Sequence, residues 1–182
     1  DEADTPDVAN LSFGDGAVDE PFSVYAWVSV EAFTSRQQIL SKYDQTTGTT
    51  LREWYFAIDA SEQPTLTLWD ESAAARLGRV GVALTAGWRF LVGTYDGSRT
   101  SAGIRVYSAA ARADTTNDNT GTYVAMENTA SLTRLASEKG AAALAQFWFD
   151  PIACVGVVGK VLTLDDQSAM KALGNSYLDL AL

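Results

Sequence analysis

Hydrophobic residues occupy alternate positions through much of the chain. In segment 22–30, apolar side chains at every second position are separated by Ser23, Tyr25, Trp27 and Ser29. A period of two is the pattern of a β-strand with one buried face. Runs rich in β-branched and aromatic residues predict further strands at 37–42, 54–58, 66–69, 78–84, 88–95, 103–107, 131–136 and 145–158.

A single segment near the C-terminus predicts a helix. We expect the helix over residues 165–173. Thr163 or Asp165 is its candidate N-cap, and Gly174 is expected to end it. The polar segment 113–121 predicts an exposed loop. Many short strands without alternating helices predict an all-β fold, a two-sheet antiparallel β-sandwich with one short C-terminal helix. We expect a core that includes Phe22, Val24, Ala26, Ile58, Leu68, Phe90, Val92, Val106 and Val155.

Composition narrows the class of protein. The chain has 182 residues, of which 47% are hydrophobic, so it is long and apolar enough for one domain with a sizeable core. The formal net charge of -10 disfavours nucleic acid as a partner. The most apolar stretch, 141–164, is interrupted by Gln146, Asp150, Pro151 and Lys160, so it predicts buried strands and not a membrane span. No signal peptide is expected at the N-terminus.

The residue types argue against an enzyme. The sequence contains no histidine, which removes the commonest general base and the usual activator of a Ser or Cys nucleophile. Asp70 and Glu71 are adjacent, so in a strand they point to opposite faces and make a poor carboxylate pair for glycoside hydrolysis. The single cysteine, Cys154, lies in an apolar run and is expected to be a small buried side chain. No catalytic residue is predicted.

Two kinds of binding site remain open. Asp15, Asp19, Glu20 and Asp150 would supply oxygen ligands for calcium if the fold brought them to one edge, whereas the alternative is that they are solvated loop acids. The tryptophans offer rings for stacking on sugars, but most have apolar neighbours and are expected to pack in the core. Trp69, which precedes Asp70 and Glu71, is the best candidate for a partly exposed ring. These tryptophans are Trp27, Trp54, Trp69, Trp88 and Trp148.

The order of the motifs resembles a known family. The similarity is carried by segments 11–14, 21–28, 39–42, 53–56, 66–70, 87–97 and 103–107. It includes an Asp96-Gly97 turn and a final strand and acidic-capped helix near 161–166. The sequence is similar to a laminin-G-like domain with the concanavalin A-like jelly-roll fold. The chain departs from the family after Tyr107, where Ala109 and Ala110 replace the usual Asn-Gly turn, and at 149–153. Segment 121–129 resembles versions found in tailed-bacteriophage particles.

The resemblance leads to a functional prediction. It implies a non-enzymatic structural or interaction protein, a phage virion accessory protein on the capsid surface, with capsid or other virion proteins as partners in an oligomeric or symmetric assembly. Residues 1–10 would be an N-terminal extension or tether, and residues 11–182 a single domain. The alternative is a carbohydrate-binding, lectin-like module with glycan partners, with or without the assistance of calcium. Neither a nucleic acid nor a membrane is expected as a partner.

Overall fold

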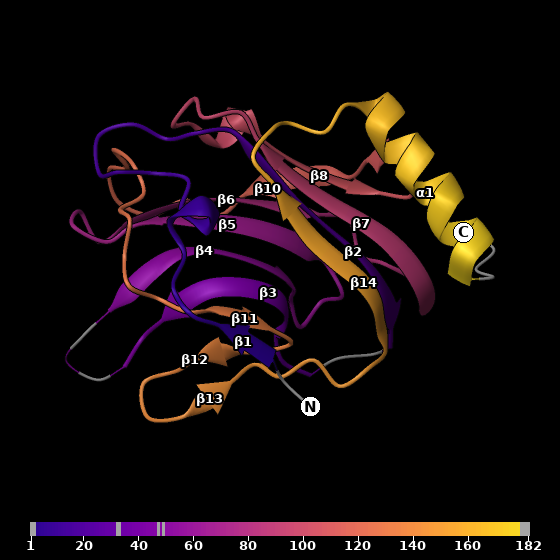
Figure 1. Cartoon of the computed structure of the whole chain (residues 1–182), viewed down its shortest axis with the longest axis horizontal. Coiled ribbons are helices and arrows are strands. Elements are labelled where there is room, and N and C mark those ends of the chain that lie inside the picture. Colours follow the sequence, from indigo (N-terminus) through magenta and orange to yellow (C-terminus); the bar gives the residue numbers. More distant parts are fainter. Residues whose placement is uncertain (1–2, 32–33, 47, 49, 179–182) are drawn as a thin grey trace.

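The chain folds as a sandwich of two antiparallel sheets. A computed structural model gives this fold and describes residues 3–31, 34–46, 48 and 50–178. The larger sheet has nine strands and the smaller has five, and a single α-helix of the described chain lies beside the smaller sheet (Figure 1). None of the described helices has the length and apolar character needed to cross a bilayer. The predicted all-β sandwich with a C-terminal helix is confirmed.

The larger sheet has the order β1-β11-β3-β4-β5-β6-β10, and a short hairpin of β12 and β13 joins it at β3. Neighbouring strands are antiparallel except for β12 and β3, which are parallel at one residue pair. Its strands are β1 (Ala3–Thr5), β3 (Gln37–Asp44), β4 (Leu51–Ile58), β5 (Pro64–Asp70), β6 (Ala75–Gly81), β10 (Asp114–Asn117), β11 (Thr133–Leu135), β12 (Glu138–Lys139) and β13 (Leu144–Ala145).

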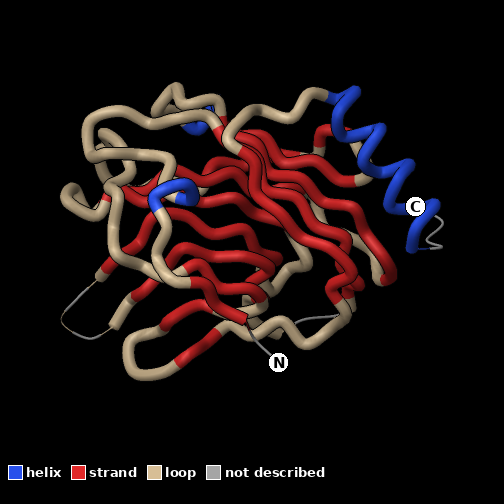
Figure 2. Tube along the Cα trace, viewed as in Figure 1, coloured by secondary structure: helices blue, strands red, loops and turns tan. Residues whose placement is uncertain are grey.

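The smaller sheet has the order β14-β2-β7-β8-β9. Its strands are β2 (Phe22–Val30), β7 (Gly87–Tyr95), β8 (Ile104–Ser108), β9 (Ala111–Arg112) and β14 (Ile152–Val158). Two short 3-10 helices, η1 (Ala9–Leu11) and η2 (Ser101–Gly103), lie in loops, and α1 (Leu164–Leu178) follows β14. Figure 2 shows how long loops connect the two sheets at their ends.

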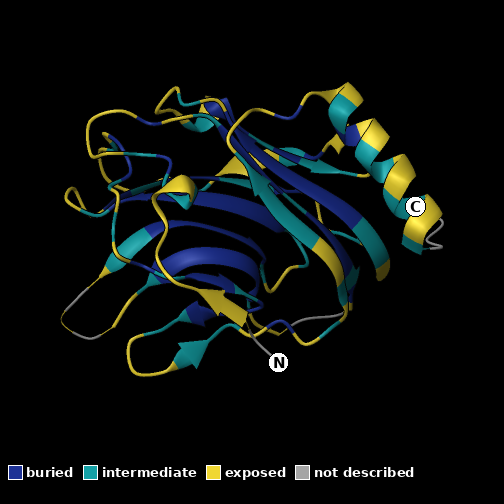
Figure 3. Cartoon of the chain, in the orientation of Figure 1, coloured by how far each residue is buried: buried dark blue, intermediate teal, exposed yellow. Residues whose placement is uncertain are grey.

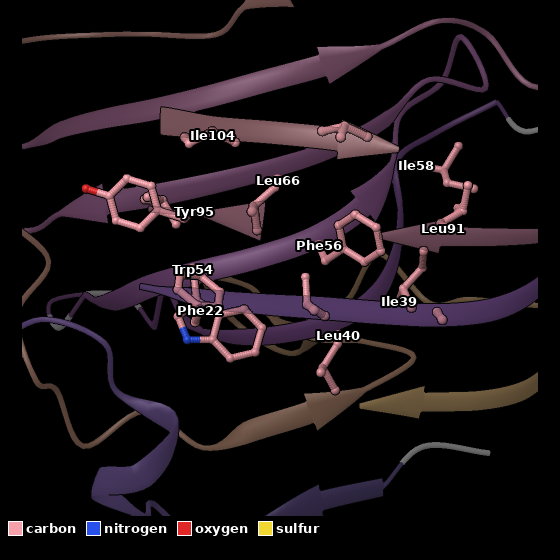
Figure 4. Packing of buried hydrophobic residues seen from close by; sticks show 14 of the residues in the cluster. Phe22, Ile39, Leu40, Trp54, Phe56, Ile58, Leu66, Leu91, Tyr95 and Ile104 are labelled. Atoms are coloured by element: carbon pink, nitrogen blue, oxygen red, sulfur yellow. The ribbon is translucent and has the colours of Figure 1, made fainter. Parts of the chain in front are cut away.

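The core lies between the sheets and is built by the period-two pattern. Alternate residues of β4 and β5 are fully buried against residues of β2, β7 and β8 (Figure 4). They are Trp54, Phe56, Ile58, Leu66 and Leu68. The predicted core residues Phe22, Val24, Ala26, Ile58, Leu68 and Val106 belong to this cluster, and Val155 packs against it while partly buried. Phe90 and Val92 are also buried, but on the other face of β7, beneath α1.

Helix α1 is longer than predicted, and Gly174 does not end it. A Cβ on Gly174 would lie 2.3 Å from Nε1 of Trp27, so this glycine lets the helix approach the indole closely. The predicted cap is confirmed at Thr163, whose hydroxyl accepts a hydrogen bond from the Asp166 amide (3.1 Å) while the Asp166 carboxylate accepts one from the Thr163 amide (2.9 Å). Figure 3 shows that α1 keeps one exposed side and rests on the other.

Two segments differ from the predictions because polar contacts and strand position override the local pattern. Residues 113–121 are not wholly a loop: β10 pairs with β6, held by the Asp114 carboxylate, which Arg79 and Arg112 both contact. Cys154 is exposed and not buried. It lies on β14, an edge strand, next to a register shift between Ile152 and Cys154, and it faces away from the core.

The described part of the N-terminal segment 1–10 runs along the larger sheet. Strand β1 pairs with β11 in register Ala3 to Leu135. The Asp7 carboxylate lies 2.8 Å from Nζ of the fully buried Lys42. A role of this segment as a tether to another protein stays a prediction.

Candidate functional site

The outer face of the larger sheet carries a cluster of aromatic rings. In β4 and β5 the positions that alternate with the core residues place Tyr55 and Trp69 on this face, and Tyr43 joins them from β3. Tyr43 lies edge-on to both rings, with centroids 5.8 Å from Tyr55 and 6.1 Å from Trp69. The cluster is separate from the main core and lies on the side of the sheet that faces away from it.

Three arginines cover these rings. The guanidinium carbon of Arg52 lies 3.8 Å from the centroid of a Trp69 ring, and that of Arg76 lies 5.4 Å away. The guanidinium of Arg36 lies 4.6 Å from the Tyr55 centroid. Such stacking is favourable because the negative face of the ring attracts a cation. We call this set, Tyr43, Tyr55, Trp69, Arg36, Arg52 and Arg76, the arginine–aromatic cluster.

Each arginine is also held by a carboxylate. Arg52 makes a two-pronged contact with Glu71, at 2.6 Å from Nε and 2.7 Å from Nη2. Glu138 accepts a hydrogen bond from Arg36 (2.6 Å), and Asp118 accepts one from Arg76 (2.6 Å). The cluster is therefore close to neutral overall, with its guanidinium groups fixed in place.

Several polar atoms of the cluster have no hydrogen-bond partner among the residues that the structure describes. These buried atoms are Nε of Arg36, Nε of Arg76, Nε1 of Trp69 and, beside them on β3, Oε1 of Gln38. A buried donor without a partner costs free energy, of the order of 1–3 kcal/mol. The side chains of Arg36 and Arg76 remain 30% and 29% exposed, so their guanidinium groups reach the surface of this face, while the unused N–H donors lie beneath it.

The electrostatics favour the charged forms in the cluster. The hydrogen bonds that Arg52 donates to Glu71 are the main reason why the pKa of Arg52 is raised. Burial by itself would raise the pKa of Glu71, but hydrogen bonds from Arg52 and Thr50 outweigh it and lower that pKa. Burial raises the pKa of the Tyr43 phenol, with a smaller contribution from Glu138. Arg52 and Glu71 therefore stay ionised, and Tyr43 stays neutral.

The sequence located only part of this cluster. Trp69 does lie on an outer face, but it is only 8% exposed because Arg52 and Arg76 cover it, so its predicted exposure is wrong. The core assignment is confirmed for Trp54 and Trp148, whereas Trp27 is buried beneath α1. Tyr55 was not singled out as a site residue, although its position in the alternating pattern of 54–58 marks it as an outer-face residue.

The four acids considered for calcium do not meet. Asp15, Asp19 and Glu20 precede the start of β2, whereas Asp150 precedes β14, whose Ile152 pairs with Val28 near the other end of β2. A strand of this length separates them by roughly 20–30 Å. Within the described ranges, no group of three or more His, Cys, Asp or Glu side chains is placed to hold a metal ion.

Among the described residues, two carboxyl groups have a raised pKa, and both make structural contacts in the interior. Burial raises the pKa of Asp19, whose oxygens accept hydrogen bonds from the Tyr95 hydroxyl (2.6 Å) and the Tyr123 hydroxyl (2.8 Å). Burial likewise raises the pKa of Glu53, which lies 2.8 Å from Nζ of Lys42. Both carboxyls are buried, and their contacts anchor loops to the sandwich.

A depression lies under α1, apart from the arginine–aromatic cluster. Tyr25, Trp27 and Cys154 of the smaller sheet form its floor, and Met170 and Leu173 of the helix form part of its wall. Its volume is about 290 Å³ and its lining is almost wholly apolar. It contains no charged side chain, in contrast to the arginine–aromatic cluster on the opposite side of the sandwich.

Comparison with solved structures gives the same architecture in sugar-related proteins. The CBM40 of the Ruminococcus gnavus IT-sialidase, bound to α2,3 sialyllactose, is similar with a TM-score of 0.66 and 14% identity over 86% of this chain and 84% of that one. A structure of botulinum neurotoxin type C, whose cell entry depends on interaction with two ganglioside molecules, has a TM-score of 0.55 and 12% identity, covering 87% of this chain and 37% of that one. A mutant Trypanosoma rangeli sialidase displaying trans-sialidase activity has a TM-score of 0.56 and 12% identity, covering 86% of this chain and 23% of that one.

Because these structures share only 12–14% sequence identity with the chain, the comparison shows a common fold alone. No curated protein matches the chain significantly. A family model described as the concanavalin A-like lectin/glucanases superfamily matches residues 3–166, which is most of the chain. The two-sheet sandwich observed above agrees with that description. The chain therefore belongs to the concanavalin A-like lectin/glucanases superfamily.

Proposed function

We propose that this protein is a lectin-like glycan-binding module without catalytic activity, and that the arginine–aromatic cluster is its binding face. The observation that carries the proposal is the set of unused donors on that face, in Arg36, Arg76 and Trp69. A carbohydrate offers many oxygen acceptors, and each donor that it satisfies relieves the cost of a buried unpaired group. The comparison with a carbohydrate-binding module in complex with sialyllactose supports the same class of ligand.

We expect a preference for sugars that carry a carboxylate. Hydrogen bonds from a guanidinium to a carboxylate are about twice as strong as neutral ones. Arg36 and Arg76 are the accessible arginines of the cluster, and each retains a free Nε–H donor among the described residues. A ligand carboxylate near either guanidinium would gain such a hydrogen bond, whereas Arg52 is already occupied by Glu71 on two nitrogens.

The carboxyl groups of this face support binding without catalysis. A glycosidase acid needs a raised pKa so that it carries a proton near neutral pH. Glu71 has a lowered pKa instead. The two acids with raised pKa values, Asp19 and Glu53, are buried in structural contacts. We therefore expect no hydrolysis of the bound sugar.

The comparisons lend no support to a phage virion accessory protein, and they favour the glycan-binding alternative. The structures named above are related to sialidases and to ganglioside interaction. A place on the capsid surface, and capsid or oligomeric partners, stay predictions that co-purification with assembled particles would test.

Titration calorimetry with α2,3 sialyllactose and with lactose tests the proposal. We expect saturable binding of sialyllactose that is tighter than that of lactose. Arg36→Gln or Arg76→Gln should each weaken it by at least about tenfold, since a charge-assisted hydrogen bond contributes roughly 1.5–3 kcal/mol. Arg105→Gln is the matched control, because Arg105 lies on β8 of the other sheet. Absence of binding to both sugars, or equal loss in the control, would refute the proposal.

A further inference from the structure

The connection from β13 to β14 runs between the two sheets (Figure 1) and carries two aromatic rings exposed to solvent. Phe149 is 78% exposed and Phe147 is 37% exposed, with ring centroids 6.4 Å apart and a tilt of 46°. Trp148 between them is buried in the main core. Because the middle residue anchors the connection, the two phenylalanines are held outward in fixed positions.

This connection begins at one end of the arginine–aromatic cluster. The Gln146 carbonyl accepts a hydrogen bond from the Gln38 amide of β3 (2.9 Å). Glu138, which pairs with Ala145 across the β12–β13 hairpin, is the residue that holds Arg36. These contacts bring the start of the connection, at Ala145 and Gln146, next to the Arg36 end of the cluster.

Polar acceptors flank the two rings. Oε1 of Gln146 and Oδ2 of Asp150 are buried atoms, and neither has a hydrogen-bond partner within the described part of the chain. Gln146 also adopts a φ of 55°, in the left-handed region that residues with a side chain rarely occupy. Backbone strain of this kind costs of the order of 1–3 kcal/mol and is found frequently at ligand sites.

We propose that Phe149, with Asp150 and Gln146, forms a second sugar subsite that receives the next ring of an oligosaccharide bound at the arginine–aromatic cluster. This inference rests on the proposed function. The apolar face of a pyranose ring would stack on Phe149, and its hydroxyls would donate to the free carboxylate and amide oxygens. Phe147 supports the platform from the side.

The surrounding chemistry favours a sugar over a lipid surface. Residues 140–151 contain no Lys or Arg, and the chain has a net charge of -10. Attachment to an anionic membrane needs basic residues near the surface. A hydrocarbon chain would also leave the acceptors of Gln146 and Asp150 unsatisfied, whereas sugar hydroxyls would satisfy them.

The test compares a single sugar with a longer one on the same variants. Calorimetry would measure the affinity for free sialic acid and for α2,3 sialyllactose in the wild type, Phe149→Ala, Asp150→Asn and Tyr177→Ala. Tyr177, on α1, is the control because it is 84% exposed and aromatic but lies on the other sheet. We expect Phe149→Ala and Asp150→Asn to weaken sialyllactose binding about three- to tenfold and to leave sialic acid binding unchanged.

The outcomes separate this inference from the proposed function. If the wild type bound neither sugar, the proposed function itself would be wrong. If the wild type bound sialyllactose and Phe149→Ala bound it equally well, only the second subsite would be refuted. An equal loss for both sugars would also refute it, since the effect would then lie at the first site. Sedimentation of the wild type with phosphatidylcholine vesicles, lost in Phe149→Ala, would assign the loop to lipid instead.

Discussion

The two sheets cover their outer faces by opposite means. On the smaller sheet, Trp27, Phe90 and Val92 are covered by α1 and by Leu162, so apolar surface is closed with apolar surface. On the larger sheet, Tyr43, Tyr55 and Trp69 are covered by the chain's own arginines. Both faces bury large rings, and each has an indole N–H without a partner among the described residues, but only on the larger sheet does the cover consist of partly exposed guanidinium groups.

This difference separates a structural contact from a site. A helix docked on a sheet gains stability in proportion to the apolar area that it covers. Long charged side chains cover rings with their stems while their polar ends stay at the surface. The smaller sheet's outer face should therefore contribute to stability alone, whereas the larger sheet's outer face should contribute to ligand binding as well.

Truncating the ring beneath the helix should have the largest effect. Trp27→Ala removes a buried indole that stacks on Phe90 at 4.3 Å and supports α1 at Gly174. We expect the free energy of unfolding to fall by about 3–5 kcal/mol. Urea denaturation would measure it, and the affinity of the folded protein for sialyllactose should not change. A loss of affinity would show that the two faces are not independent.

Acid should weaken the arginine–aromatic cluster. The pKa of Glu71 is lowered in the folded state, so its contribution to stability is present above its ordinary value of 4.5 and is lost as the pH falls below it. Urea denaturation of the wild type should thus show decreasing stability from about pH 5 toward pH 3.

Glu71→Gln is the variant that isolates this effect. It should be less stable than the wild type at pH 7 and should lose less stability on acidification. Glu20→Gln, which changes an exposed carboxylate, serves as the control and should follow the wild-type curve. A Glu71→Gln curve parallel to that of the wild type would contradict the assignment.

A smaller effect is expected at the hairpin between β8 and β9. Ser108 pairs with Ala111, which leaves Ala109 and Ala110 as a two-residue turn with φ values of 54° and 62°. Turns of this kind favour Asn-Gly because both positions are left-handed. Ala110→Gly should raise the free energy of unfolding by about 0.5–1 kcal/mol, because it removes strain in the folded state. A thermal melt would measure the change, and a lower melting temperature would contradict it.

The sequence was sufficient for the fold because the fold depends on local alternation. The pattern in 22–30 and 54–58 identified β2 and the end of β4, together with the residues of each that face the core. The same pattern was misleading where a contact from elsewhere decides the structure. Local sequence predicts a helix end at Gly174, although the role of this glycine is defined by Trp27, far away in the sequence.

The candidate site was less predictable because its members come from separate strands. Arg36, Arg52 and Arg76 are unremarkable surface residues in the sequence, and only the registers of β3, β4, β5 and β6 bring them over the rings. Trp69 carried the only signal, and its burial under Arg52 depends on that register. The phenylalanine pair could not be recognised because the sequence predicts one strand over 145–158, which is wrong for residues 146–151: they connect β13 to β14.

The indole N–H groups give the most direct test of the proposal that the arginine–aromatic cluster binds glycans. The chain has five tryptophans, of which Trp69 lies in the arginine–aromatic cluster and Trp27 lies beneath α1. A two-dimensional proton–nitrogen NMR titration with α2,3 sialyllactose would follow each indole signal, assigned by Trp→Phe variants. We expect the Trp69 signal to move and saturate while the Trp27 signal stays fixed. Movement of Trp27 with Trp69 unchanged, or no movement of any indole, would contradict the account.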